Sequence, residues 1–379
     1  MAIDNKDKKI LNVPHLRFPE FSGEWEMVSL QDIATINPKS DPLQNTFIYI
    51  DLEAVEKGEL RKIQEIMREE APSRAQRVID NNDILFQCVR PYQKNNYIHR
   101  ILNTSNQQWV ASTGYAQIRT TELPNYIYHL LNTDEFNRKV MVRCTGSSYP
   151  AINSEDLATI HLYYTPDKKE QLKISRLLDL LDKRIATQNK IIEKLQSLIK
   201  GLRVCCMQRV YGNNVYLSEI AQIYQPQTIS STELTEDGFL VYGANGIIGK
   251  YKDYNHETEQ ICITCRGNTC GMVNYTKPMS WITGNAMVIN TDKYQDKVYK
   301  RYLYHYLSAY NFNSIISGSG QPQIVRTPLE KLKITLPTIS EQKQKAMILD
   351  KIQNKIDTNH KELNLYVRQK QYLLRQMFI

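Results

Sequence analysis

One stretch of this chain is written twice. Residues 166–187 read PDKKEQLKISRLLDLLDKRIAT, and residues 337–358 read PTISEQKQKAMILDKIQNKIDT. In each copy an Asp or Thr follows the proline, and a glutamate, Glu170 or Glu341, stands three residues further on. That pattern is typical of a capped helix start, in which the glutamate reaches back to the cap. The sequence therefore predicts two long helices with equivalent beginnings.

Apolar residues in both helices alternate at spacings of four and three, which is typical of a coiled-coil seam and narrower than the stripe of a globular helix. A polar residue in such a seam costs stability but fixes the register. We therefore expect the helices to pair, either parallel or antiparallel, with Gln188 and Asn359 setting the register. The alternatives are two independent amphipathic helices, each on its own domain, and polar side chains that merely face solvent. The predicted seam comprises Ile174, Leu178, Leu181, Ile185, Gln188, Ile192, Leu195, Ile199 and Leu202 in the first helix, and Leu349, Ile352, Ile356, Asn359, Leu363, Tyr366 and Leu373 in the second.

The regions between the helices are also related to each other. VSLQDIATI (28–36) recurs as VYLSEIAQI (215–223), STGYAQI (112–118) as ITGNAMV (282–288), YIYHLL (126–131) as YLYHYL (302–307), and TGSSYPAI (145–152) as SGSGQPQI (317–324). Short β-rich runs such as FIYI, DILFQCV, QICITC and AMVIN mix with helical stretches such as residues 126–141. The sequence predicts an α+β fold with two similar globular domains, 1–165 and 211–336, and two long helices, 166–210 and 337–379. An antiparallel pair of helices would relate the domains by an approximate two-fold axis.

The positive charge of the chain is unevenly distributed. The net charge is +8, yet residues 167–210 hold 11 Lys/Arg against five Asp/Glu, and residues 338–379 hold eight against four. The excess favours a polyanionic partner, whose contacts outside the helices must come from local patches. No apolar run approaches the roughly 18 residues needed to cross a bilayer, and the polar start lacks a signal-peptide core. We expect a cytoplasmic protein with no membrane partner.

The seven cysteines do not indicate a disulfide framework, because their number is odd and Cys205 and Cys206 are adjacent in a helical pattern. Cys262, Cys265 and Cys270 faintly resemble a zinc cluster. Since that stretch has the pattern of a strand and no second ligand pair lies nearby, we favour the interpretation without a metal.

Sequence motifs for catalysis are missing from the chain. There is no Asn/Asp-Pro-Pro-aromatic run for a flipped adenine, no G-x-G-x-x-G between a strand and a helix, and no G-x-x-x-x-G-K-[ST]. His129 and His305 recur at equivalent places, but the sequence offers no matched carboxylate or nucleophile for either. We interpret both histidines as structural and expect no catalytic residue.

Predicted loops after strand ends are rich in side chains that read base edges or hold phosphates. For any single residue the alternative is ordinary solvated polarity, but the clustering favours contact with double-stranded DNA. Two similar but divergent readers on a stiff spacer suit a two-part site with unlike halves. The candidates are Arg74, Arg90, Tyr92, Lys94 and Asn95 in the first domain, and Asn245, Lys250, Arg266, Asn268, Asn285, Gln321, Gln323 and Arg326 in the second.

Over essentially its whole length the chain resembles the specificity subunits of type I restriction–modification systems. The resemblance rests on NVPHLRFPEFSGEWEMVSLQDIA, APSRAQRVIDNNDILFQCVRP, VYGANGIIGKY, RGNTCGMVN, SGSGQPQI and the two helices that open with EQ, in this order. It implies two target-recognition domains that each read half of a bipartite, asymmetric DNA site, and an antiparallel coiled coil that sets their separation.

The same resemblance implies that two methyltransferase subunits and the restriction subunits are partners. It also implies that this chain holds no cofactor and performs no chemistry, so that S-adenosylmethionine, ATP and Mg²⁺ are expected on the partner subunits. Two alternatives differ in class. One is a stand-alone coiled-coil DNA-binding or adaptor protein without a methyltransferase partner, and the other is a nuclease or methyltransferase in its own right.

Overall fold

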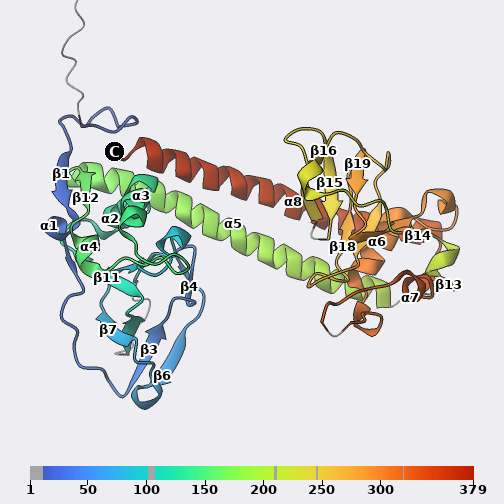
Figure 1. The fold of residues 1–379 in the computed structure, drawn as a ribbon, viewed down its shortest axis with the longest axis horizontal. Coiled ribbons are helices and arrows are strands. Elements are labelled where there is room, and N and C mark those ends of the chain that lie inside the picture. Colours follow the sequence, from blue (N-terminus) through green and yellow to red (C-terminus); the bar gives the residue numbers. More distant parts are fainter. Residues whose placement is uncertain (1–11, 101–106, 209–210, 245, 319) are drawn as a thin grey trace, which may run out of the picture. The chain divides into compact units, whose positions relative to one another are not determined.

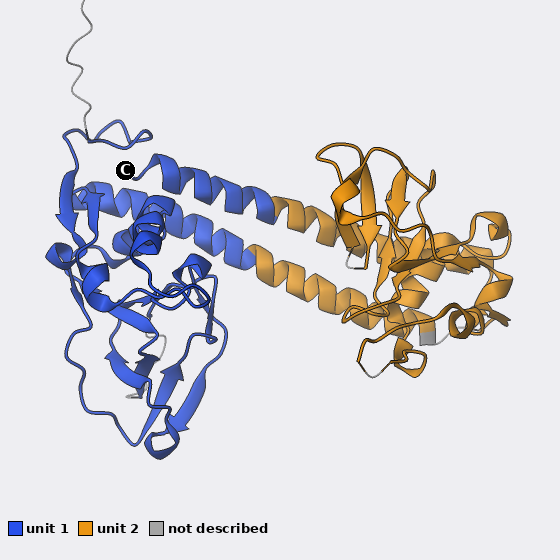
Figure 2. Cartoon of the chain, in the orientation of Figure 1, with its two compact units in different colours: residues 1–187, 363–379 blue, residues 188–362 orange. Residues whose placement is uncertain are grey.

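The computed structural model describes residues 12–100, 107–208, 211–244, 246–318 and 320–379. The chain forms two compact units, shown in different colours in Figure 2. Unit 1 comprises residues 1–187 and 363–379, and unit 2 comprises residues 188–362. Each unit therefore contains one globular lobe and a part of both long helices. Within the described residues, no helix is both long and apolar enough to cross a bilayer.

Unit 1 contains two four-stranded sheets, with strand orders β2-β11-β8-β9 and β6-β3-β10-β7, and a separate pairing of β1 with β12. Strands β10 and β3 are parallel, and the other pairs in these sheets are antiparallel. Its strands and helices are β1 Glu26–Ser29, α1 Leu30–Ile33, β2 Ala34–Ile36, β3 Thr46–Ile50, β4 Val55–Glu56, β5 Glu59–Leu60, β6 Gln64–Met67, β7 Ala75–Ile79, β8 Ile84–Gln87, β9 Tyr97–Ile98, β10 Gln108–Ser112, β11 Tyr115–Thr120, α2 Pro124–Leu131, α3 Asp134–Arg143, α4 Ser154–Ala158, β12 His161–Tyr164 and the first part of α5 Lys168–Gln208 (Figure 1).

Unit 2 follows the same plan, except that its second sheet has three strands in place of four. The strand orders are β14-β20-β17-β18 and β16-β15-β19, and β13 pairs with β21. The parallel pair recurs as β15 with β19, so the sequence repeat is a repeat of topology as well. Its elements are β13 Asn213–Tyr216, β14 Gln222–Tyr224, β15 Phe239–Gly243, β16 Gly246–Tyr251, β17 Ile261–Thr264, β18 Val273–Tyr275, β19 Ser280–Ile282, β20 Ala286–Asn290, α6 Lys300–Ala309, α7 Arg326–Glu330, β21 Lys333–Leu336 and most of α8 Ile339–Gln376.

The predicted α+β character is confirmed, and the four β-rich runs lie in β3, β8, β17 and β20. The helix expected across residues 126–141 is wrong in one respect, because it is two helices. Thr133 stands at the break, in an extended conformation, and its side chain accepts a hydrogen bond from the Phe136 amide at 3.2 Å. A side-chain cap at this point starts α3 as a new helix.

The start of α8 agrees with the predicted capping pattern, and the start of α5 differs from it in one contact. At α8 the capping box is complete, since the Thr338 amide donates to Glu341 at 3.0 Å and the Glu341 amide donates to Thr338 at 3.3 Å. At α5 the cap Asp167 accepts from the Lys169 amide at 2.8 Å, but Glu170 does not reach back. Its buried carboxylate instead accepts from the Thr165 hydroxyl at 2.7 Å and pairs with Arg17 at 2.7 Å.

The glutamine that follows this glutamate in both copies attaches the long helix to a lobe. Gln171 and Gln342 are both buried. The Gln171 side-chain oxygen accepts from the amide of Leu123 at 3.3 Å, and that of Gln342 accepts from the amide of Tyr299 at 2.8 Å. Leu123 and Tyr299 are the N-caps of α2 and α6, where amides have no partner within the helix. The duplicated glutamine therefore makes the same hydrogen bond to an N-cap amide in each unit.

Within each unit a part of α5 lies beside a part of α8 and runs in the opposite direction (Figure 1). In unit 1 the Lys370 ammonium pairs with Asp182 at 2.5 Å, and the Arg184 guanidinium lies 5.0 Å from the ring centroid of Tyr366. In unit 2 the Arg203 guanidinium donates to Gln353 at 3.3 Å, and the Lys345 ammonium donates to the Cys206 carbonyl at 2.9 Å. Positions therefore rise along α5 as they fall along α8, which confirms the antiparallel pairing and excludes two independent helices. The seam positions are buried at Ile174, Leu178, Gln188, Ile192, Ile199, Leu349, Ile356, Asn359 and Leu373, and half-buried at Leu181, Ile185, Leu195, Leu202, Ile352, Leu363 and Tyr366.

The two polar seam positions contact each other in unit 2. Gln188 is 7% exposed and Asn359 is 4% exposed, so neither side chain faces solvent. The Gln188 amide nitrogen donates to the Asn359 side-chain oxygen at 2.7 Å and to Glu362 at 3.1 Å. Since the Asn359 nitrogen donates to the Lys355 carbonyl at 2.6 Å, both amides have partners. A shift of the helices by one turn would separate the pair in an apolar seam, which is the physical basis for a role in register.

We predict that Asn359→Leu lowers the free energy of unfolding by about 1–3 kcal/mol, because it removes the shortest of the hydrogen bonds that the buried Gln188 amide donates. The double variant Gln188→Leu/Asn359→Leu should recover most of this loss, since apolar pairs are tolerated in a seam. Urea unfolding followed by circular dichroism measures both, and the exposed Asn364→Leu on the same helix is the control. Strictly additive losses in the double variant would contradict a coupled pair.

Candidate nucleic-acid interface

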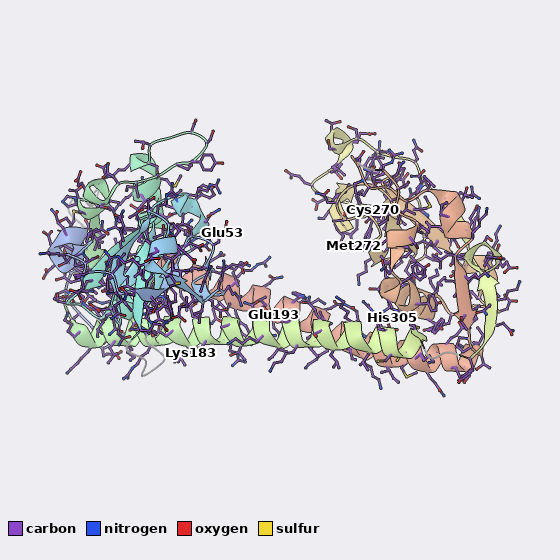
Figure 3. The ribbon with its side chains drawn as sticks, turned by 90° about the horizontal axis from the view of Figure 1, so that it is seen from below. Glu53, Lys183, Glu193, Cys270, Met272 and His305 are labelled. Atoms are coloured by element: carbon purple, nitrogen blue, oxygen red, sulfur yellow. The ribbon has the colours of Figure 1, made fainter. Side chains whose placement is uncertain are left out.

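A cleft of about 720 Å³ opens on the lobe of unit 1. It brings together Arg74 and Arg90, two of the residues that the sequence predicted for DNA contact. The buried Gln87 also lines it and donates both to the Val89 carbonyl and to the Gln93 side-chain oxygen, each at 2.8 Å. The remaining lining residues are Leu52, Glu53, Thr113, Gly114 and Tyr149, and Glu53 is labelled in Figure 3.

Arg90 is held in this cleft by an unusual backbone. Its φ of 55° and ψ of 55° are left-handed, a conformation that costs a non-glycine residue about 1–2 kcal/mol. The main chain fixes it there, since its amide donates to the Pro150 carbonyl at 2.7 Å and its carbonyl accepts from the Gln93 amide at 3.0 Å. The Arg90 guanidinium lies 4.3 Å from the ring centroid of Tyr149, which is 64% exposed. A stacked guanidinium is pre-oriented, and it is the group that grips phosphates or guanine edges.

The other candidates of unit 1 lie in different settings. Arg74 and Tyr92 are exposed, and neither side chain has a polar partner among the described residues. Lys94 is tied to Asp134 at 2.8 Å, and Asn95 accepts from the Lys57 amide at 3.0 Å in support of a turn. The latter two side chains have structural contacts that the sequence did not indicate.

In unit 2 the backbone brings together Arg266, Asn285 and Gln323. Arg266 and Gln323 face each other in an isolated antiparallel bridge, and the Cys265 amide donates to the Asn285 carbonyl at 3.1 Å. The side chains of all three are exposed, as are those of Asn268 and Gln321 in the adjoining turns. Figure 3 labels Cys270 and Met272, which mark the end of the turn that follows Arg266.

The remaining unit 2 candidates stand apart from this group. Lys250 is on β16 and pairs with Asp237 at 3.2 Å, and Arg326 is at the start of α7 and pairs with Glu330 at 2.6 Å. Asn245 lies outside the described residues.

Sequence reasoning missed Tyr149 as a part of the unit 1 cleft. Tyr149 lies in the turn TGSSYPAI, whose repeat in unit 2 has Gln321 at the same place. A comparison of the two copies could have identified Tyr149, because it differs from its counterpart Gln321 within a repeated motif. Such differences are expected where two domains bind different half-sites.

The interpretation that His129 and His305 lack carboxylate partners is wrong. His129 on α2 lies 2.8 Å from Asp179 on α5, and His305 on α6 lies 2.8 Å from Asp350 on α8. Both histidines are fully buried. The two aspartates occupy equivalent positions in the repeated helices, far in sequence from the histidines, so local spacing did not reveal the pairs. Each pair fastens a lobe to a long helix.

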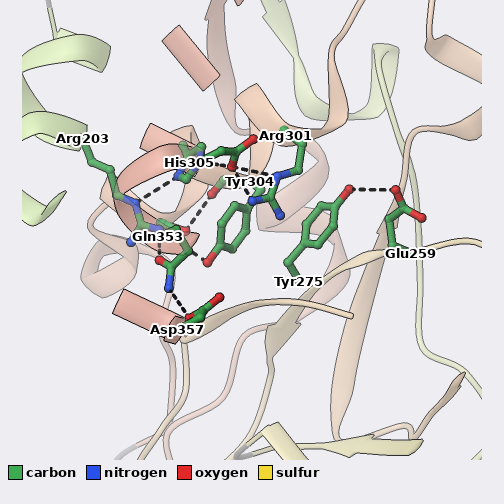
Figure 4. A network of polar contacts seen from close by, with 10 residues as sticks. Arg203, Glu259, Tyr275, Arg301, Tyr304, His305, Gln353 and Asp357 are labelled. Atoms are coloured by element: carbon green, nitrogen blue, oxygen red, sulfur yellow. Dashed lines mark hydrogen bonds and ion pairs between the residues drawn. The ribbon is translucent and has the colours of Figure 1, made fainter. Parts of the chain in front are cut away.

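The unit 2 pair belongs to a larger network (Figure 4). Arg203 of α5 donates to the Nδ1 atom of His305 at 3.1 Å. Since arginine only donates, Nδ1 must accept, and the proton sits on Nε2, which donates to Asp350. Arg301 also donates to Asp350, at 2.8 Å, and its guanidinium lies 4.3 Å from the ring centroid of Tyr275. Burial lowers the pKa of His305, in keeping with a neutral ring.

Of the three cysteines that faintly resembled a zinc cluster, Cys262 and Cys265 are core residues and Cys270 is partly buried. Cys262 and Cys265 are buried in different clusters, and burial raises the pKa of Cys262 to about 12. The described residues contain no group of three or more His, Cys, Asp or Glu side chains that could hold a metal ion.

The family model of the type I restriction modification DNA specificity domain matches residues 22–197 and 213–365. The two matches cover most of the chain, and each takes in one lobe and a part of one long helix. The chain belongs to this family. The helices are therefore part of the repeated specificity domain and not a linker between two of them.

Several specificity subunits are similar to this specificity-domain chain. The type I restriction enzyme EcoprrI specificity subunit of Escherichia coli is 32% identical over 147 residues, which are 38% of this chain and 36% of that protein. The putative specificity subunit S.HindORF215P of Haemophilus influenzae is 28% identical over 140 residues, 35% of each chain. The matched part thus spans about a third of each of these relatives. The MjaVIII specificity subunit of Methanocaldococcus jannaschii is 23% identical over 94% of this chain and 92% of its own.

Solved structures share the fold of this specificity-domain chain. The crystal structure of a type I restriction-modification S subunit from M. genitalium has a TM-score of 0.67 at 16% identity and covers 97% of this chain and 99% of its own. A chain solved in work on complex assembly and conformational transition of the type I R-M system has a TM-score of 0.56 at 20% identity and covers 95% and 98%.

We predict that unit 2 loses stability between pH 7 and pH 5 through His305. Its pKa is below the ordinary value of about 6.5 in the folded chain, so the unfolded chain takes up the proton first as the pH falls. His305→Gln, which can still donate to Asp350 and accept from Arg203, should reduce the pH dependence of the urea midpoint. His256, whose pKa burial also lowers, leaves a residual slope.

The exposed His360→Gln is the matched control for this prediction and should leave the slope as in the wild type. An unchanged slope in His305→Gln would contradict the role given to this ring.

Proposed function

We propose that this chain is the DNA sequence-specificity subunit of a type I restriction–modification complex. Each lobe reads one half of a bipartite, asymmetric site in double-stranded DNA. The chain scaffolds two methyltransferase subunits and the restriction subunits, and it carries out no chemistry itself. S-adenosylmethionine, ATP and Mg²⁺ would be held by the partner subunits.

One observation carries the proposal beyond family membership. The two lobes share a backbone plan down to individual bridges, yet the exposed side chains on that plan differ. Arg90 in unit 1 has the same main-chain contact as Gly267 in unit 2, since their amides donate to Pro150 and Pro322 at 2.7 and 2.9 Å. Divergent polar side chains on a common frame are what two readers of unlike half-sites require.

Charge and aromatic surface in the unit 1 cleft support contact with DNA. Arg74 is exposed and Arg90 is stacked on an exposed tyrosine, so the cleft offers two guanidinium groups beside the amide side chain of Gln93. Such groups bind phosphates without sequence preference and base edges with it.

The paired helices support the scaffolding role. At about 1.5 Å per residue, helices of 41 and 38 residues are roughly 60 Å long, and their shared length would set the number of unread base pairs between half-sites. Their outward faces carry exposed apolar side chains, including Leu180, Met347, Ile348 and Leu365. Exposed apolar residues beside a basic excess suit protein partners with acidic, partly apolar surfaces.

Deleting the gene from its host tests the function directly. We expect one split, asymmetric methylation motif to vanish from the genomic DNA when sequenced with base-modification detection, and to return on complementation. The alternative, a stand-alone DNA-binding or adaptor protein, predicts an unchanged methylation pattern together with retained DNA binding by the purified chain.

We further predict that Arg90→Gly weakens binding to cognate duplex DNA by about 1–3 kcal/mol. The variant removes the guanidinium while placing glycine at a left-handed position, so its thermal stability should equal or exceed that of the wild type. Fluorescence anisotropy at two salt concentrations measures the affinity, and the exposed Arg138→Ala on α3 is the control. Unchanged affinity in Arg90→Gly would remove the cleft from the DNA contact.

A further inference from the structure

Two side chains of unit 2 are held side by side by main-chain contacts alone. Arg266 and Gln323 are opposite partners of an antiparallel bridge. Around it the Ile324 amide donates to the Cys265 carbonyl at 3.0 Å, and the Gly267 amide donates to the Pro322 carbonyl at 2.9 Å. Directly opposite residues place their Cβ atoms about 4.5–5.5 Å apart and on the same face. The backbone therefore fixes the spacing of this pair without using either side chain.

Both side chains are exposed and make no polar contact with another described residue. This separates them from Lys250 and Arg326 of the same unit, whose charges are already paired with Asp237 and Glu330. A guanidinium and a primary amide, neither with a polar partner among the described residues, thus lie side by side on one bridge.

The chemistry of this pair matches two particular bases. Arginine donates in a fork to the O6 and N7 atoms of guanine, and glutamine donates and accepts in a matched pair with the N7 and N6 atoms of adenine. Neighbouring bases of one strand are about 3.4 Å apart along the axis, which is within reach of two long side chains whose Cβ atoms are about 5 Å apart.

We propose that Arg266 and Gln323 form a base-reading pair that recognises neighbouring guanine and adenine bases in the major groove of the half-site bound by unit 2. The proposal rests on the proposed function, and it adds the bases and the residues that select them.

Unit 1 has the same bridge without the same side chains. Val89 and Ala151 take the places of Arg266 and Gln323, and the Ile152 amide donates to the Cys88 carbonyl at 3.1 Å, as at the equivalent point of unit 2. Neither valine nor alanine forms side-chain hydrogen bonds. The bridge therefore selects guanine and adenine only in the half-site of unit 2, and unit 1 reads its half-site from other positions, such as Arg90.

The test uses the full-length chain and a library of duplexes with a 30-base-pair random region, roughly three turns of B-DNA, from which bound duplexes are selected and sequenced. For the wild type we expect a split motif with a fixed guanine next to a fixed adenine in one half. Arg266→Ala should relax only the guanine, and Gln323→Ala only the adenine, each with a fall in discrimination of about 5- to 150-fold.

Two conservative variants distinguish lost base recognition from a general loss of DNA affinity. Arg266→Lys keeps the charge but loses the fork, and Gln323→Met keeps the shape but loses the amide. Each should retain DNA binding and still relax its own base. Lys333→Ala, which removes another exposed charge of unit 2, should leave the motif unchanged.

The outcomes are distinguishable. A wild-type motif that persists in all four variants, or an even loss of affinity without relaxed base choice in Arg266→Lys, overturns the base-reading pair and leaves the proposed function standing. Selection of no motif by the wild-type chain, together with an unchanged host methylation pattern on gene deletion, overturns the proposed function itself.

Discussion

The antiparallel contact between α5 and α8 is the interaction on which the rest of the structure depends. Each unit is built around a segment of both helices, so neither lobe has a complete core without the pairing. In unit 1 the apolar cluster joins Ile174 and Leu178 of α5 to Leu373 and Leu374 of α8, and both helices share it with α2. In unit 2 the corresponding cluster joins Ile199 of α5 to Leu349 and Ile356 of α8. The seam is thus continuous with the cores of the lobes, and burial of its apolar surface stabilises helix pairing and lobe docking together.

Polar contacts give this apolar arrangement its specificity. A buried amide pair forms in the seam, and a glutamine from each long helix accepts from the N-cap amide of a lobe helix. A histidine from each lobe also contacts an aspartate of a long helix. All these groups are buried at least in part, so displacing any of them would leave a donor or acceptor unsatisfied in an apolar setting, at a cost of about 1–3 kcal/mol each. Such contacts destabilise alternative packing of a lobe on the helices more than they stabilise the native packing. This is the physical reason why the duplicated polar residues are found at equivalent places.

The surfaces that we propose for DNA contact differ from the helix contacts in this respect. Their main-chain bridges are repeated in the two units, but their side chains are not. Among the cationic candidates, Lys94, Lys250 and Arg326 are already paired with carboxylates, whereas Arg74 and Arg266 have no such partner among the described residues and Arg90 is stacked on Tyr149. A paired charge must lose its partner before it binds an anion, so the unpaired guanidinium groups are the better candidates for base or phosphate contact.

The sequence by itself determined the α+β character, the duplication, the two long helices and most of their seam, because these depend on local periodicity, capping residues and repeated motifs. It also predicted Arg74, Arg90, Arg266 and Gln323 as candidates for DNA contact, because these residue types lie in loops that follow strands. Only the tertiary structure decided the break at Thr133, the antiparallel direction of the helices, the partners of His129 and His305, and the division of the DNA candidates into free and engaged side chains. These features depend on contacts between residues far apart in the chain, such as Arg203 with His305, and no local pattern encodes which distant group a buried donor will meet.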